Sequence, residues 1–282
     1  MSFCKRVLLI VLISLSAGCA TDGAGLFEKA KQVSRDYDAA TGMAYGRAAE
    51  KPIVNGVEVG AEEAEARSAV LLLITRGSSI HACTGVFVKS KVLLTAAHCV
   101  SGVETKKVRV VFQTRGLAQV ESTSDMKPSK ILIHEKYDGR PENYSDLALL
   151  ILPEPAPSGY ESVALHDAKE KVEGDQVLLL GYGITGETKK DSMVLRKTTK
   201  SFKNEIHLKP SYFGIDQKSE TGGFCRGDSG APVFVTVAGK RRLFGINSFT
   251  VGLEKDRECH TASVGMASAH FKPWIEKNAK KF

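Results

Sequence analysis

From Ile53 to the C-terminus, apolar positions fall in short runs that turn residues separate. The runs are four to seven residues long and rich in β-branched residues, a length and composition that favour strands over helices. They cover residues 69–75, 85–88, 92–96, 108–113, 131–134, 147–152, 177–180, 233–237 and 243–248. Many short strands at such spacing predict an all-β domain, built as sandwiches or barrels.

The first eighteen residues follow a different pattern. Lys5-Arg6 precedes an almost wholly apolar run, Val7 to Leu15, and Ser16-Ala17-Gly18-Cys19 follows it. This order is typical of an export signal, and the apolar run is too short for a stable membrane-spanning helix. Cys19 after Ala-Gly resembles a bacterial lipoprotein cleavage site, although Ser16 stands where such sites usually carry Leu. The alternative is an ordinary secretory signal cut near Ala17 or Ala20.

Residues 19–52 are polar, rich in Ala and Gly, and contain no cysteine after Cys19. A short helix is predicted over residues 26–37, and a flexible stretch is predicted after it. We interpret residues 1–18 as the signal and 19–52 as a lipidated tether or propeptide. The expected location is the periplasm or cell surface, with the membrane contacted only through lipid on Cys19. Cleavage near Ile53 would release the rest to the medium.

Composition and charge narrow the class of protein. The chain has 282 residues, of which 43% are apolar and 25% charged, so it can bury a sizeable core. The net charge of +7 is spread along the sequence, with clusters only at 189–190, 240–242 and the tail 277–281. This pattern is more typical of a solvated surface than of a nucleic-acid interface.

Cysteine usage indicates an oxidising compartment. Without Cys4 and Cys19, four of the six cysteines remain, an even number that suits disulfides. Four cysteines allow three pairings. A zinc site is the alternative, but no Cys-x-x-Cys or paired His spacing supports it.

Three separate motifs together supply a nucleophile, a base and an acid. Thr95 to Cys99 contains His98, Asn143 to Leu150 contains Asp146, and Gly227 to Pro232 contains Ser229. A serine hydroxyl is a weak nucleophile, so a histidine must accept its proton and later return it to the leaving amine. The acid fixes the imidazole tautomer and stabilises the imidazolium. Each motif alone is weak, since Gly-Asp-Ser-Gly is an ordinary turn.

The chain order His98, Asp146, Ser229, with separations of 48 and 83 residues, resembles the chymotrypsin/trypsin family of serine peptidases. The resemblance implies two six-stranded antiparallel β-barrels over residues 53–282, with a boundary near residue 165 and a terminal helix over 274–280. It implies disulfides Cys83–Cys99 and Cys225–Cys259. It also implies an oxyanion hole from the amides of Gly227 and Ser229, a peptide or protein substrate, and no cofactor or metal.

The resemblance also assigns the pocket for the side chain before the scissile bond. Its positions are Gly223, Phe224, Ser248, Phe249, Thr250 and Ser263. Gly223 stands at the floor, where a trypsin would carry an aspartate, so a Lys or Arg side chain there would be left unpaired. Thr250 replaces a glycine and narrows the entrance, and Ser248 supports Asp146. We predict cleavage after small or medium aliphatic residues, with a larger apolar residue as the alternative.

Ile53-Val54-Asn55-Gly56 resembles the mature N-terminus of the family. There, a freed ammonium pairs with the aspartate beside the nucleophile, here Asp228, and orders the pocket and oxyanion hole. An activating protease would have to cut after Pro52, which trypsin-like activators do poorly. The alternative is that Ile53 only begins a strand and the chain is never cut.

Other functions match less of the sequence. Gly181-Tyr182-Gly183-Ile184-Thr185-Gly186 fits a dinucleotide-binding fingerprint in letters, but residues 187–191 open no amphipathic helix. The loop 112–121 lacks the flanking carboxylates of a calcium site. An ester hydrolase is disfavoured because there is no Gly-x-Ser-x-Gly elbow. A zymogen-like binding or regulatory protein on the same fold remains the second hypothesis, and the oligomeric state stays open.

Overall fold

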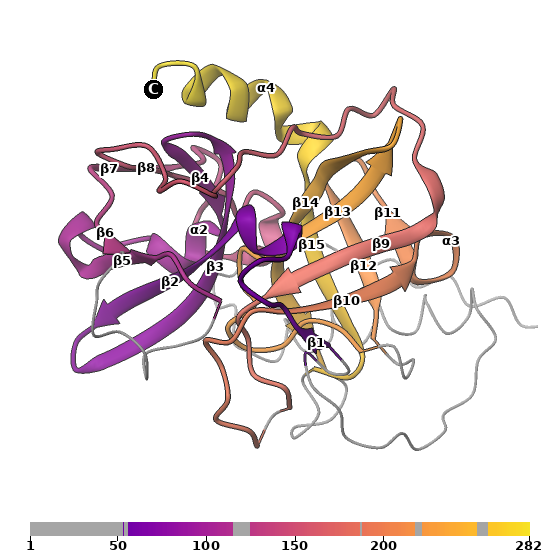
Figure 1. Cartoon of the computed structure of the whole chain (residues 1–282), viewed down its shortest axis with the longest axis horizontal. Coiled ribbons are helices and arrows are strands. Elements are labelled where there is room, and N and C mark those ends of the chain that lie inside the picture. The colour runs from indigo at the N-terminus through magenta and orange to yellow at the C-terminus, as the bar shows by residue number, and fades with distance from the viewer. Residues whose placement is uncertain (1–52, 54–55, 115–124, 187, 218–221, 253–258) are drawn as a thin grey trace, which may run out of the picture. The chain divides into compact units, whose positions relative to one another are not determined.

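The computed structural model describes residues 53, 56–114, 125–186, 188–217, 222–252 and 259–282. The predicted signal, Cys19, the tether 19–52 and most of the loop 112–121 lie outside the described residues. Within the described part, most of the regular secondary structure is strand, arranged in two antiparallel sheets, and a helix ends the chain (Figure 1). No helix in this part is both long and apolar enough to cross a membrane.

The first sheet has the strand order β6-β5-β2-β3-β4-β8-β7. Its strands are β2 (Ala69–Arg76), β3 (Ser79–Lys89), β4 (Val92–Thr95), β5 (Val108–Val111), β6 (Asp125–Met126), β7 (Lys130–Ile133) and β8 (Ala148–Ile151). The edge strands β6 and β7 are joined by residues 127–129, which span at most about 14 Å. The two edges therefore lie close together, the sheet curls on itself, and β6 and β7 act as one interrupted strand of a six-stranded barrel.

The second sheet has the order β1-β10-β9-β13-β14-β15-β12-β11. Its strands are β1 (Val57–Glu58), β9 (Glu173–Gly181), β10 (Arg196–Ser201), β11 (Ile206–Leu208), β12 (Tyr212–Asp216), β13 (Pro232–Val237), β14 (Lys240–Val251) and β15 (Ala262–Ala267). The one-turn helix α3 (Phe202–Glu205) joins β10 to the far edge strand β11 and brings these edges together. The short β1 is added outside this second barrel, so the predicted double-barrel fold is confirmed.

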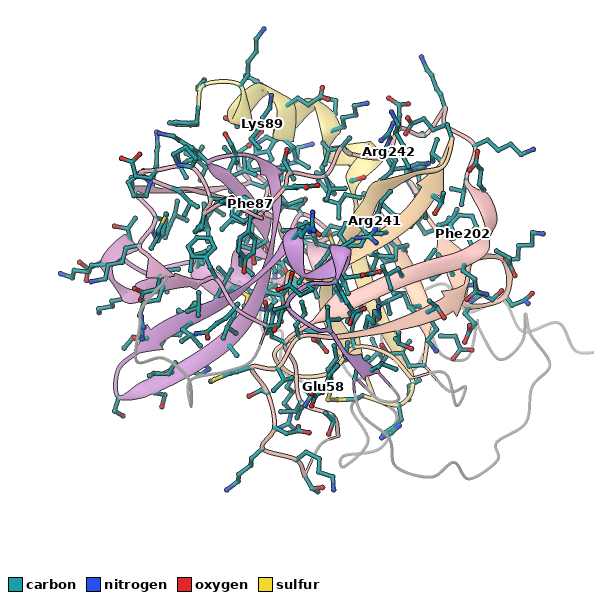
Figure 2. The ribbon with its side chains drawn as sticks, in the orientation of Figure 1. Glu58, Phe87, Lys89, Phe202, Arg241 and Arg242 are labelled. Atoms are coloured by element: carbon teal, nitrogen blue, oxygen red, sulfur yellow. A yellow bond between two sulfur atoms is a disulfide. The ribbon has the colours of Figure 1, made fainter. Side chains whose placement is uncertain are left out.

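Strand β2 explains why its sequence is an unbroken apolar run. Side chains alternate between the two faces of a strand. Val70, Leu72 and Ile74 join one buried cluster, together with Phe87 (Figure 2). Leu71 and Leu73 join another cluster, which also contains Phe234, Ile246 and Met266 of the second sheet. One face of β2 fills the first barrel, and the other packs between the barrels.

Short helices occupy the connections: η1 (Ala64–Arg67), α2 (Ala97–Val100), η2 (Thr105–Lys107) and η4 (Pro141–Asn143). The chain passes to the second barrel between β8 and β9, where Leu243 N donates to Ala164 O at 2.9 Å. Figure 2 labels the basic residues Arg241 and Arg242 on β14. Arg241 pairs with Glu65 and Arg242 with Glu170.

The terminal helix α4 covers Ser268–Ala279, so it begins six residues before the predicted start at Trp274. Pro273 lies inside it, not at its first turn. Phe271 and Ile275, four residues apart on one face, are both buried in the cluster between the barrels. This packing holds the helix together across the proline.

Candidate active site

His98 lies on the one-turn helix α2, directly after β4. Such a short helix satisfies few of its own last carbonyl groups; Ala97 O and Val100 O accept from the backbone just after the helix. Arg76, the last residue of β2, is a donor to others. Its Nη2 donates to His98 O at 3.1 Å, Cys99 O at 3.2 Å and Ser101 O at 3.1 Å. No sequence motif marked Arg76, because its partners are 22 to 25 residues away.

Asp146 immediately precedes Leu147 and strand β8 and is fully buried. Its carboxylate accepts from His98 N at 2.8 Å, from His98 Nδ1 at 2.7 Å, and from Ser248 Oγ. Burial raises the pKa of Asp146, but the hydrogen bonds and charge of His98 and the hydroxyl of Ser248 outweigh it and hold that pKa below its usual value. The acid is therefore ionised and fixes the orientation of the ring.

Ser229 completes this chain of side chains, with its Oγ 2.8 Å from His98 Nε2. Its loop is tied to both barrels. Thr84 N, on β3, donates to Ser229 O at 2.8 Å. Asn247, on β14, accepts from Gly230 N at 2.8 Å through its carbonyl and donates from Nδ2 to Asp228 O at 3.0 Å. The three predicted residues thus come together where the two barrels meet.

The backbone before Ser229 has the form that the predicted oxyanion hole needs. Gly227 has φ +98°, a backbone conformation that glycine adopts readily and residues with a Cβ atom do not. The amides of Gly227 and Ser229 donate to no acceptor among the described residues, whereas the intervening Asp228 N bonds Cys225 O at 3.1 Å. Two free N–H groups, on the nucleophile and two residues before it, can together stabilise an oxyanion.

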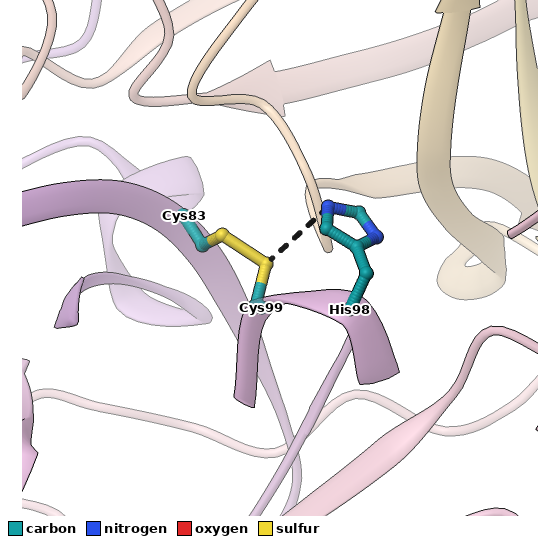
Figure 3. A group of neighbouring side chains, drawn as sticks. All are labelled: Cys83, His98 and Cys99. Atoms are coloured by element: carbon teal, nitrogen blue, oxygen red, sulfur yellow. Dashed lines mark hydrogen bonds between the residues drawn. A yellow bond between two sulfur atoms is a disulfide. The ribbon is translucent and has the colours of Figure 1, made fainter. Parts of the chain in front are cut away.

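Both predicted disulfides are present. Cys83–Cys99 joins β3 to α2, and Cys225–Cys259 joins the nucleophile segment to the chain before β15. Figure 3 shows that the first lies beside the imidazole, with Cys99 Sγ 3.8 Å from His98 Nε2. Cys83, His98 and Cys99 are close enough to resemble a metal site, but both sulfur atoms are consumed in the disulfide. This triplet does not fit a metal ion, because a thiolate is the form that ligates.

Asp228 is the second fully buried carboxylate. It accepts from Gly183 N at 2.7 Å and from Cys225 N at 2.8 Å. A Cβ at Gly181 or Gly183 would overlap this carboxyl group, which explains two of the three glycines of the rejected nucleotide fingerprint. Burial raises the pKa of Asp228 to about 7, against the amides of Cys225 and Gly183 and the charge of Arg196.

Arg196 orders the loop that donates to Asp228. Its side chain is almost fully buried, and its Nη1 donates to Gly183 O at 3.3 Å, Asp191 O at 3.0 Å and Val194 O at 3.4 Å. Asp191 in turn accepts from Thr185 N and Oγ1. Sequence reasoning missed Arg196, since nothing in its neighbours distinguishes it from other strand residues.

Ile53 is fully buried, next to Gly56, whose N donates to Ile53 O. Its φ is +21°, which is an outlier for a β-branched residue. This residue is the one before which the sequence predicts a cut.

The predicted pocket residues lie on neighbouring segments. Ser248 Oγ bonds Asp146, and two residues later Thr250 pairs with Ser263 across β14 and β15. Phe249 is half-buried against the cluster between the barrels, and Phe224 is fully buried in the second barrel. Gly223 lies against Gln217, a residue that the sequence did not single out.

Known proteins are similar to this chain over most of its length. A family model described as Trypsin matches residues 55–275. A trypsin of Simulium vittatum is 30% identical over 76% of this chain and 90% of its own length. An elastase family member 1 of Canis lupus familiaris is 28% identical over 72% of the chain and 84% of its length, and a human granzyme M is 29% identical over 78% and 88%. Because the family model covers most of the chain and agrees with the fold, the chain belongs to the trypsin family of serine peptidases.

Proposed function

We propose that this chain is a serine endopeptidase that hydrolyses peptide bonds through an acyl-enzyme on Ser229. The main support for this proposal is the continuous chain of hydrogen bonds from Ser229 Oγ through His98 to the buried Asp146. His98 Nε2 takes the Ser229 proton while Oγ bonds to the substrate carbonyl carbon. The same proton then passes to the leaving amine as the C–N bond breaks.

Water completes the cycle by the same route. Its proton moves to His98, its oxygen bonds to the acyl carbon, and Ser229 Oγ leaves and recovers the proton. In both halves the charge develops on the carbonyl oxygen, which the free amides of Gly227 and Ser229 would stabilise by roughly 3 to 4 kcal/mol per donor.

For the substrate, we propose cleavage after a small or medium aliphatic residue. Gly223 offers no counter-charge for Lys or Arg, and Thr250 adds a β-branched side chain to the wall. A cleavage profile led by Lys or Arg would contradict this preference. The relatives include both elastases and a trypsin, so family membership alone does not decide the residue that precedes the cleaved bond.

The first test is Ser229→Ala. Turnover should fall by about 10⁶-fold, as when a triad nucleophile is removed, while both disulfides still form. Hydrolysis of a peptide series and labelling by a fluorophosphonate are the measurements. A pure Ser229→Ala preparation with parental activity would rule out the mechanism.

We also propose that the enzyme is exported through the leader, lipidated at Cys19 as in bacterial lipoproteins, and activated by cleavage before Ile53. That cut would free the ammonium for Asp228 and also sever the covalent link to the lipid. Intact mass, N-terminal sequencing and fluorophosphonate labelling of membrane and soluble fractions test this model together. Strong labelling of a membrane-bound chain that begins at Cys19 would overturn it.

A zymogen-like binding or regulatory protein is the second candidate. The observation that favours it is the raised pKa of Asp228, whose hydrogen-bond donors in the uncleaved chain are two neutral amides. A chain that is never cut and never labels, although correctly folded, would support this alternative.

A further inference from the structure

Gln217, the first residue after β12, is fixed in one orientation by its own amide group. Nε2 donates to Phe224 O at 2.9 Å and to Cys259 O at 2.8 Å, and Oε1 accepts from Phe224 N at 2.6 Å. The residue is only 2% exposed. Three of the four hydrogen bonds that a primary amide can make are thus formed inside the protein.

This side chain fills the space beside Gly223. A Cβ built on Gly223 would overlap Cγ, Cδ and Oε1 of Gln217. A long flexible side chain could normally swing away, but here the movement would break the hydrogen bonds to the buried N–H and C=O of Phe224, which is costly. Gly223 therefore has no room for a side chain while Gln217 is in place.

The neighbouring wall is also short and polar. Thr250 and Ser263 are direct partners across β14 and β15, so their side chains lie on the same face. Ser263 is fully buried, and its Oγ has no hydrogen-bond partner within the described part of the chain. A small ligand with a hydroxyl group could pair with it.

We propose that Gln217 is a specificity-determining residue that closes the floor of the pocket, so that the enzyme prefers Ala or Ser before the scissile bond to Leu, Phe or Lys. The inference rests on the proposed function, in which the substrate residue before the scissile bond lies against Gly223 and Thr250. The floor formed by Gln217 is neutral, and three of the four hydrogen bonds that its amide can make are already formed within the protein. A longer apolar side chain meets the Gln217 amide, and a cation finds no carboxylate.

The test compares three forms of the activated enzyme on peptides that differ only in the residue before the scissile bond. The parent should cut Ala and Ser fastest. Gln217→Ala should raise kcat/KM for Leu relative to Ala by about tenfold or more, the scale of one to a few methylene groups in a pocket. Gln217→Met is the matched control: it fills a similar volume without hydrogen bonds and should keep the preference for Ala.

A second arm introduces charge. Gly223→Asp alone should not create cleavage after Lys, because Gln217 occupies the space, whereas Gly223→Asp with Gln217→Ala should create it. Gly223→Ala should lower the melting temperature in the parent and less so in Gln217→Ala, a readout that needs no activity.

Active-site counting separates the two levels of failure. Fluorophosphonate labelling gives the fraction of competent Ser229 in each form. A folded parent that never labels would contradict the proposed function. A labelled parent that prefers Leu or Phe, or a Gln217→Ala profile identical to the parent's, would overturn the role of Gln217 alone. If Gln217→Ala does not fold, the parent profile and the Gln217→Met control still decide the outcome.

Discussion

The two fully buried carboxylates of the site, Asp146 and Asp228, behave in opposite ways. Asp146 receives three hydrogen bonds, two of them from His98, and its pKa is held below the usual value. Asp228 receives two, both from neutral backbone amides, and its pKa is raised to about 7. Equal burial therefore does not mean equal charge.

The difference indicates which carboxylate has its full set of partners. Around Asp146, the donors and the imidazole compensate the loss of water. Around Asp228, compensation is incomplete, although Arg196 orders the neighbouring loop. A cation delivered next to Asp228 would correct this, and an ammonium on Ile53 is the one that the proposed activation would supply. The region around Asp146 is thus complete in the uncleaved chain, and the region around Asp228 is not.

Among the changes that test this contrast, the largest effect is expected from Asp146→Asn. An amide in place of the carboxylate would favour the wrong tautomer of His98 and remove the charge that stabilises the imidazolium, so kcat should fall by about 10⁴-fold. Steady-state hydrolysis of an Ala peptide measures it. Unchanged disulfides and melting temperature serve as the control, and a loss below tenfold would show that Asp146 is not the orienting acid.

The next effect concerns cleavage before Ile53. The incomplete compensation of Asp228 corresponds to roughly 4 kcal/mol, because its pKa of about 7 lies about three units above the ordinary value, at 1.36 kcal/mol per unit. If the new ammonium recovers most of it, cleavage should raise activity by up to about 10³-fold. A chain with a protease site engineered in place of residues 49–52 can be cut at will and assayed before and after. Equal activity of the two forms would show that Asp228 needs no cation.

Local sequence and resemblance predicted the parts of the site that depend on short motifs. His98, Asp146 and Ser229 each lie in a short motif that can be recognised from its adjacent residues. The strands are visible as apolar runs because each barrel needs an apolar inner face. The contacts of Arg76, Arg196 and Gln217 could not be predicted in this way. They bond backbone groups up to 42 residues away, and a backbone carbonyl leaves no mark on the sequence.

The start of the terminal helix was wrong for a related reason. Pro273 favours the first turn of a helix by local preference, but the burial of Phe271 and Ile275 extends α4 back to Ser268. Tertiary packing thus outweighed the local signal. The six-strand count, in contrast, holds for each barrel once interrupted strands are joined, because curling a sheet brings its two edge segments together.

A third prediction uses pH. Between about pH 4 and pH 7, Asp228 is ionised in the unfolded chain and protonated in the uncleaved folded chain, so the folded state binds more protons. The free energy of unfolding should therefore fall as pH rises through this window, by up to roughly 4 kcal/mol from this group. Urea unfolding of Ser229→Ala chains, which cannot digest themselves, measures the slope.

Two forms control this measurement. Asp228→Asn in the uncleaved chain should lose that part of the slope, since the amide does not titrate. The cleaved chain should lose it too, because the ammonium lowers the pKa of Asp228. A cleaved chain with the same slope as the uncleaved one would mean that Ile53 and Asp228 do not pair.

The smallest effect is expected from Ser248→Ala, which takes one of the three donors from Asp146. A hydrogen bond to a charged group contributes about 1.5 to 3 kcal/mol, but His98 N and Nδ1 remain bonded and hold the carboxylate in place. We expect kcat to fall by about tenfold, which is 1.36 kcal/mol, with KM for Ala peptides little changed.

The acid limb of the pH–rate profile is the discriminating readout, because Ser248 acts on the charge of Asp146 and through it on His98. Ser248→Thr keeps the hydroxyl and should recover most of the rate. If Ser248→Ala lowered kcat as far as Asp146→Asn, the complete compensation of Asp146 would depend on this single hydroxyl, and its contrast with Asp228 would be much smaller than the hydrogen bonds suggest.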